Sequence, residues 1–176
     1  MRNMFMKKIL IPAALLFIAC TLFAGETPSP LSGTYRSSAG MYGKAELIFH
    51  EDMFFYVDNN CTLRGNYYVA KDKITFTLKG FHHVSLHLYN MEETFDIKKQ
   101  ESYVKIDNYS ISCKMKYSNG TLEPGPRFFW IEHLMNSAST CSRMNEKGMQ
   151  AIIGVQKVIS KDRDLTEWYR FTSLQK

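Results

Sequence analysis

The sequence lacks the motifs that identify most enzymes and cofactor-binding proteins. It contains no Gly-x-Ser-x-Gly elbow, no His-Glu-x-x-His segment and no glycine-rich phosphate loop. Its four cysteines include no Cys-x-x-Cys pair, and its five prolines and ten glycines form no long linker. These absences favour a non-enzymatic protein without a cofactor, folded as one domain.

A metal site is not favoured either, although three of the five histidines lie close together in the sequence. In a strand, His83 and His87 share a face but stand about 13 Å apart, since each residue advances the chain by ~3.3 Å. Two ligands of one ion must lie within about 4 Å of each other. His82 points to the opposite face, and the methionines are scattered, so we expect surface histidines and no bound metal.

The most informative segment that is present is a leader at the amino terminus. Arg2, Lys7 and Lys8 precede an apolar run over residues 9–19, which ends at Cys20. A basic start followed by an apolar run of this length is typical of an export signal. The run falls short of the ~20 residues that cross a bilayer. We therefore expect an exported protein of the periplasm or cell surface.

Two cleavage sites fit this leader, and they place the mature protein differently. Cleavage after Ala24 would remove residues 1–24 as an ordinary signal peptide and release a soluble protein. Alternatively, residues 16–20 resemble a bacterial lipobox, whose cysteine, here Cys20, becomes lipidated and anchors the chain to a membrane. Phe17 occupies a lipobox position at which Leu, Val or Ala is usual. The sequence leaves both sites open.

Removal of the leader leaves a protein with little net charge. The leader takes three of the 22 basic residues and none of the 17 acidic ones, so the net charge falls from +5 to +2. The remaining charges of both signs alternate along the chain, which argues against a nucleic-acid partner. We expect a short spacer over residues 25–30 and a single domain over residues 31–176.

Hydrophobic periodicity in this domain is mostly that of β-strands. Residues 73–79, 83–88 and 109–117 alternate apolar with polar side chains, as half-buried antiparallel strands do. Further strands are predicted at residues 44–50, 53–57, 65–70, 94–98, 103–106, 127–132, 150–160 and 167–174. Turn residues separate them at positions 51–52, 58–60, 71–72, 119–120 and 161–164. The one helix that the pattern allows lies around residues 131–138.

Many short strands at regular spacing predict an all-β domain. We expect a small antiparallel up-and-down β-barrel of about 8–10 strands, because closure removes the exposed strand edges. A β-sandwich is the alternative architecture.

The order of motifs near the start of the domain carries a family resemblance. Gly33-Thr34-Tyr35 precedes the hairpin over residues 45–57, and Gly65-Asn66-Tyr67 precedes the alternating strand over residues 73–79. This order resembles bacterial lipocalin-like envelope proteins, including the amino-terminal barrel of the copper-resistance outer-membrane lipoprotein family. The resemblance covers about residues 31–79 and implies a lipocalin-like barrel. It does not carry over metal or redox activity, because those relatives have a Cys-x-x-Cys pair and this chain has none.

Three cysteines remain after cleavage at either site. Cys113 lies on the apolar face of a predicted strand and is expected to be a small buried side chain. Cys61 follows a turn and Cys141 lies in a polar stretch, so a Cys61–Cys141 disulfide is the favoured pairing. One thiol is then unpaired within the chain.

Aromatic residues are the remaining guide to function. Interior rings of a small barrel line a cavity for one apolar ligand when the barrel is hollow. The candidate ligand-binding residues are Phe55, Tyr67, Phe76, Leu86, Met115 and Trp130. The leading hypothesis is a non-enzymatic envelope binding protein that holds a small hydrophobic ligand or a protein partner. The alternative is an interaction, inhibitor or stress-related protein with a filled barrel, acting through loops at residues 118–126 and 137–147.

Overall fold

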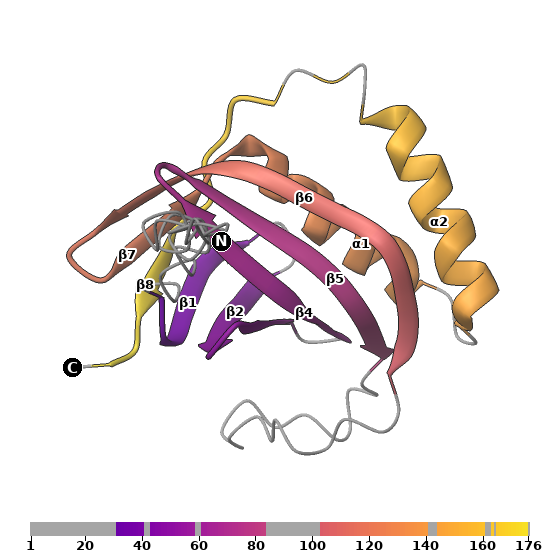
Figure 1. Ribbon diagram of the computed structural model, residues 1–176, viewed down its shortest axis with the longest axis horizontal. Coiled ribbons are helices and arrows are strands. Elements are labelled where there is room, and N and C mark those ends of the chain that lie inside the picture. Colours follow the sequence, from indigo (N-terminus) through magenta and orange to yellow (C-terminus); the bar gives the residue numbers. More distant parts are fainter. Residues whose placement is uncertain are drawn as a thin grey trace, which may run out of the picture.

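The computed structural model describes residues 31–40, 43–58, 61–83, 103–140, 144–160, 163 and 165–175. Eight antiparallel strands, each paired with the next in the sequence, close into an up-and-down barrel (Figure 1). The strands are β1 (Gly33–Gly40), β2 (Gly43–His50), β3 (Met53–Val57), β4 (Cys61–Ala70), β5 (Lys73–His83), β6 (Val104–Ser118), β7 (Thr121–Pro124) and β8 (Phe171–Ser173). The predicted barrel is therefore confirmed, with eight strands.

The predicted alternation of side chains holds in the central strands. In β5, Ile74, Phe76 and Leu78 are fully buried, while the threonines between them are half-exposed. In β6, Tyr109 and Ile111 lie opposite Leu78 and Phe76 and are buried on the same face. One face of each strand thus forms the barrel core, as period-two sequences require.

The turns predicted at residues 51–52, 71–72 and 119–120 are confirmed. Glu51, Lys71 and Asn119 each adopt a positive φ, between 49° and 55°, in the tight turns after β2, β4 and β6. A glycine is required at a different kind of position: the register of β4 and β5 shifts at Gly65. A Cβ atom there would lie 2.0 Å from the carbonyl oxygen of Thr77, so only glycine lets the two strands approach.

Two segments that we predicted as strands are helical. Residues 127–132 belong to the short helix η2 (Pro126–Phe128) and to α1 (Phe129–Ser139), which confirms the helix predicted around residues 131–138. Pro126 at the start of η2 has its φ preset for a helical turn. The strand prediction was wrong because the adjacent aromatic rings are buried on several sides of a helix rather than on two faces of a strand.

The strand predicted over residues 150–160 is also wrong, because these residues form most of α2 (Glu146–Ile159). Its β-branched residues favoured a strand, but Met149, Ile153 and Gln156 lie at helical spacing and are the buried side chains. The Asn145 side chain accepts a hydrogen bond from the Gly148 N–H at 2.9 Å and caps the helix. This cap, together with Glu146 in the first turn, is a helix-start signal that the strand prediction overlooked.

The remaining predictions are corrected in length rather than in type. The loop expected over residues 118–126 contains a hairpin turn and the short strand β7. The strand expected over residues 167–174 is reduced to β8. The predicted strand at 94–98 lies outside the described residues, as does that at 83–88 beyond His83, where β5 ends.

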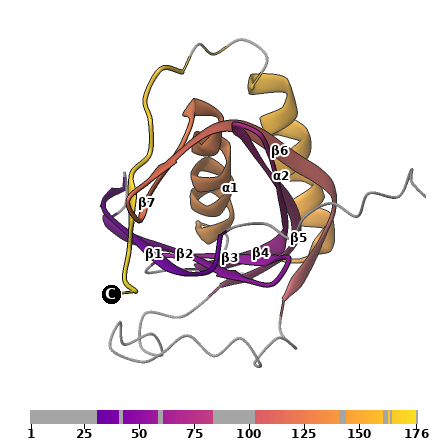
Figure 2. The same ribbon diagram turned by 60° about the vertical axis from the view of Figure 1, so that its left-hand side comes forward.

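The barrel interior is packed with aromatic rings around α1. Figure 2 shows α1 within the ring of strands. Phe128, just before α1, lies at the centre of this packing and is fully buried. Its ring contacts those of Tyr56, Phe76, Tyr169 and Phe171, with centroids 5.1 to 5.7 Å apart. These rings pack against one another and form a filled aromatic core inside the barrel.

On the side of β6 opposite β5, only part of the strand is paired with another strand. β7 pairs only with the last four residues of this long strand, Met115 to Ser118. β8 pairs with β7 and with β1 through two residue pairs each and completes the circle. On the side of β6 opposite β5, the first half of this strand has helical neighbours, with α2 packed against β6 and against α1 (Figure 1). No helix among the described residues is long and apolar enough to cross a membrane.

Candidate functional site

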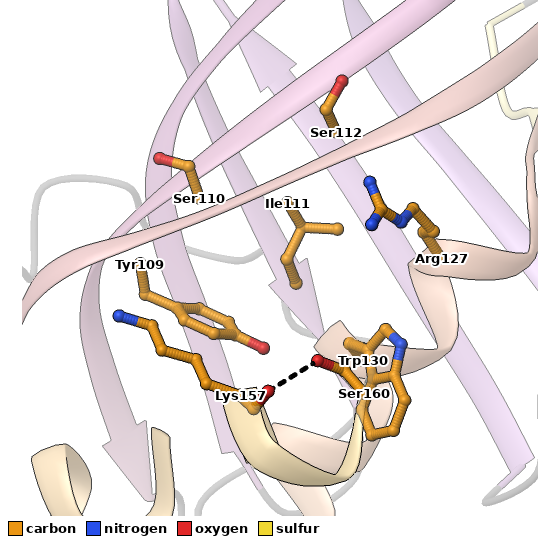
Figure 3. Close-up of a pocket in the computed structure, with 8 residues that line it drawn as sticks. All are labelled: Tyr109, Ser110, Ile111, Ser112, Arg127, Trp130, Lys157 and Ser160. Carbon is orange, nitrogen blue, oxygen red and sulfur yellow. Dashed lines mark hydrogen bonds between the residues drawn. The ribbon is translucent and has the colours of Figure 1, made fainter. Parts of the chain in front are cut away.

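A small pocket lies where β6, the start of α1 and the end of α2 meet (Figure 3). Its volume is about 150 Å³. The lining residues are Tyr109, Ser110, Ile111 and Ser112 of β6, Arg127 and Trp130 from η2 and α1, and Lys157 and Ser160 at the end of α2. We call it the edge pocket, because it lies along the part of β6 that β7 does not cover.

The strand edge in this pocket presents unpaired backbone groups. The Lys114 carbonyl turns away from β5, because it accepts a hydrogen bond from the Gly125 N–H at 2.7 Å. Antiparallel strands alternate, so that every second residue directs both its N–H and its C=O to the same side. Ser112 and Ser110, two and four residues earlier in the same regular register, therefore point their backbone groups into the edge pocket. No described strand pairs with them on that side.

Two basic side chains flank this edge. The Lys157 ammonium donates a hydrogen bond to the Asn108 carbonyl at 3.2 Å and lies 5.9 Å from the centre of the Tyr109 ring. The Arg127 guanidinium points towards β6 (Figure 3) and forms no hydrogen bond or ion pair with the described part of the chain. No acidic residue lines the pocket. The edge pocket is therefore basic.

A buried hydrogen bond lies beneath the edge pocket. The Tyr109 hydroxyl donates a hydrogen bond to the Gln156 side-chain oxygen at 3.3 Å, and Gln156 is only 2% exposed. Burial raises the pKa of Tyr109 to about 12, so this hydroxyl stays protonated at neutral pH. The contact fixes α2 against β6 and thereby positions Lys157 beside the strand edge.

A second polar group lies deeper, inside the barrel. Glu132 of α1 is 3% exposed, and its Oε1 atom accepts a hydrogen bond from the Tyr56 hydroxyl at 2.9 Å. Burial raises the pKa of this carboxyl, and the hydroxyls of Tyr56 and Tyr169 offset the effect only in part. Glu132 is thus a core carboxyl that retains its proton to higher pH than an exposed one.

Cys61 is not an activated nucleophile. The Cys61 thiol is buried, 3.6 Å from an Asp58 carboxylate oxygen and 3.7 Å from the Met135 carbonyl. Burial, with the Asp58 charge, raises its pKa far above the usual value, so the reactive thiolate is suppressed. No three His, Cys, Asp or Glu side chains of the described residues are placed to share a metal ion.

The described part of the chain holds two of the cysteines. Cys61 is a free, buried thiol there, and the partner predicted for it, Cys141, lies outside the described residues. Cys113 is also free and buried, as predicted from its place on the apolar face of β6. Burial raises its pKa to about 12. Cys20, the candidate lipidation residue, lies outside the described residues.

The predicted ligand-binding residues do not form one site. Phe76 is part of the ring packing in the core, and Tyr67, directly opposite it on β4, donates a hydrogen bond to the Leu31 carbonyl at 2.6 Å. Met115 is half-buried against the same core. Of the candidates that the structure describes, only Trp130 lines the edge pocket.

The two remaining candidates are Phe55 and Leu86. Phe55 packs in a separate small cluster with Ile48, Val57 and Met53, on the face of β3 opposite to the barrel core. Leu86 lies outside the described residues.

The sequence reasoning missed three residues that distinguish this protein: Arg127, Glu132 and Lys157. All three lie in segments that we predicted as strands but that form helices. Predicted strands gave no reason to expect these side chains to lie at one site. The proline at the start of η2 and the capping asparagine of α2 could have revealed the helices. The unpaired edge of β6 had no sequence signal, because β6 alternates in the same way with or without a partner strand.

The comparisons with known proteins do not add a relative. No protein-family model matches the chain, and the searches of curated proteins and of solved structures found no significant similarity.

Proposed function

We propose that this chain is an exported, non-enzymatic envelope protein of lipocalin-like type that binds a protein partner at the edge pocket. The observation that carries the proposal is a contrast between two parts of the barrel. Aromatic rings fill the interior, whereas the edge of β6 at the pocket has no partner strand among the described residues. Phe128 and the rings around it occupy the interior, whereas Ser110 and Ser112 present unpaired backbone groups between two cations. A protein partner fits this surface better than a hydrophobic ligand held among the interior rings.

Site-specific photo-crosslinking in cells of the native host tests this proposal. A photoreactive phenylalanine analogue placed at Ser112 should form a defined adduct with an envelope protein. The same analogue at Tyr68, an exposed residue of β4 on another part of the wall, serves as the control and should form none. Equal labelling from both positions, or none from Ser112, would reject the edge pocket as a binding surface.

Native mass spectrometry of the purified domain tests the competing ligand hypothesis. We expect the mass of the chain alone, without a co-purified lipid. A stoichiometric lipid, or uptake of a fluorescent fatty acid that α1 variants abolish, would instead support ligand carriage in the barrel.

The export part of the proposal depends on the leader, with Arg2, Lys7 and Lys8 before the apolar run. Labelling with radioactive palmitate separates its two forms. Incorporation that disappears in Cys20→Ala indicates a lipoprotein, whereas a mature chain that begins after Ala24 and carries no label indicates a soluble protein.

A further inference from the structure

We propose that the partner segment is an extended acidic peptide that adds to the free edge of β6 as an additional strand. This inference rests on the proposed function, since it names the chemistry of the partner bound at the same pocket. Extended peptides bind sheet edges through main-chain hydrogen bonds, and their alternating side chains supply specificity. The edge at Ser110 and Ser112 offers an N–H and a C=O from each of the two residues.

The length of the free edge is set by a contact at each end. The Lys114 carbonyl is occupied by the Gly125 N–H, and the Asn108 carbonyl by the Lys157 ammonium. The window between them spans about 7 Å from Ser110 to Ser112, at ~3.3 Å per residue. About three residues of an extended peptide pair with such a window, and the adjoining residues of the peptide continue beyond it.

Pocket size favours a peptide over a free small molecule. Sites for small organic ligands commonly enclose about 300–1,000 Å³, whereas the edge pocket holds about 150 Å³. That volume accommodates one side chain of a strand laid along β6. The peptide backbone would lie along the open edge, which bounds the pocket on one side.

The charges at the pocket determine which side chain enters it. Arg127 and Lys157 approach from opposite sides, and the lining contains no acidic residue. Arg127 has no carboxylate partner among the described residues, so its guanidinium is available to a ligand. A guanidinium binds a carboxylate through charge-assisted hydrogen bonds, and Trp130 supplies an apolar wall for the aliphatic part of that side chain. An aspartate or glutamate side chain is therefore the expected occupant.

Fluorescence anisotropy with defined peptides tests the inference. The probe is a labelled, end-blocked heptapeptide of alternating Val and Thr with a central Glu. We expect saturable binding, about tenfold weaker when the central Glu is Gln, and none when the backbone nitrogens on one edge are methylated. Hydrogen exchange at the Ser110 and Ser112 amides should slow when the unmethylated peptide binds.

Protein variants separate the charge from the backbone contribution. Arg127→Gln should weaken binding of the Glu peptide about tenfold and leave binding of the Gln peptide unchanged. Lys147→Gln, which removes a lysine from the other end of α2, is the matched control and should have no effect. An equal loss for both peptides in Arg127→Gln would contradict the assigned contact.

Other outcomes overturn the inference in distinguishable ways. Competition by free glutamate or inorganic phosphate as strong as that by the peptide would indicate a small-anion site, and binding of anionic vesicles without the peptide would indicate a membrane surface. No peptide binding together with a specific adduct from Ser112 in cells would refute strand addition but leave the proposed function intact. No adduct from Ser112 would refute the proposed function itself.

Discussion

The two α-helices in the described part of the chain, α1 and α2, are held by different forces. α1 lies inside the barrel, where six of its eleven residues are buried, and its first residue follows η2 without a side-chain cap. α2 buries only three of its fourteen residues and starts with the Asn145 cap. Packing therefore stabilises α1, and capping together with a narrow apolar stripe stabilises α2. Substitutions in α1 should therefore destabilise the fold more than substitutions in α2. The exposed side chains of α2, in contrast, can form part of a binding surface.

Truncation of a core residue of α1 should have the largest effect on stability. Leu134 is fully buried, so Leu134→Ala should lower the free energy of unfolding by about 2–5 kcal/mol through lost burial and a residual cavity. Urea unfolding at constant m-value measures the change. A loss below 1 kcal/mol would contradict the assignment of α1 to the core.

Neutralisation of Glu132 should change the pH dependence of stability. Its pKa is raised in the folded protein, so the folded state binds the proton more tightly than the unfolded state does. This contribution is complete below the unfolded carboxyl pKa of about 4.3 and is lost as the pH rises through the folded pKa. Each unit of difference between the two pKa values corresponds to about 1.4 kcal/mol.

Glu132→Gln should therefore remove that part of the pH dependence, as measured by urea unfolding between pH 4 and 9. The exposed α2 residue Glu146 provides the control, because Glu146→Gln should retain the native slope. Identical slopes for all three proteins would show that Glu132 does not titrate differently in the folded state.

Loss of the α2 cap should have an intermediate effect. Asn145→Ala removes the hydrogen bond to the Gly148 N–H and should cost about 1 kcal/mol. Asn145→Asp retains an acceptor at the same place and should cost less. If Asn145→Ala and Asn145→Asp were equally destabilised, α2 would depend on packing alone, as α1 does.

The smallest effect should come from the exposed side of α2. Val158 is 68% exposed, and Val158→Ala should change the free energy of unfolding by no more than about 0.5 kcal/mol. A clearly larger loss would mean that this face of α2 is covered, and the contrast with α1 would then fail.

The strands were predictable because each carries its own inside-to-outside alternation. β5 and β6 alternate regularly over residues 73–78 and 109–114, where they pair without a shift of register, and the same pattern selects their buried faces. α1 gave a weaker signal. It is buried on several sides, so the segment from Phe128 to Met135 is apolar apart from Glu132 and His133, and strand and helix look alike in so short a segment.

The candidate site was not predictable from the sequence, because it forms where one edge of β6 has no partner strand among the described residues. Arg127 and Lys157 are thirty positions apart and both reach β6 only because η2 and α2 pack against it. Nothing in residues 104–114 indicates that β7 stops after four residues. The length of one short strand, rather than any motif, creates the open edge.

The seam between β1 and β8 has a consequence for the order of folding. It joins Tyr35 to Ser173 and Arg36 to Thr172, residues from nearly opposite ends of the described chain. Until β8 has emerged, one edge of β1 and one edge of β7 remain exposed, and the aromatic core lacks Phe171. A chain that is synthesised from its amino terminus would therefore remain an open sheet until its last strand is made. During that interval it would be vulnerable to edge-to-edge aggregation.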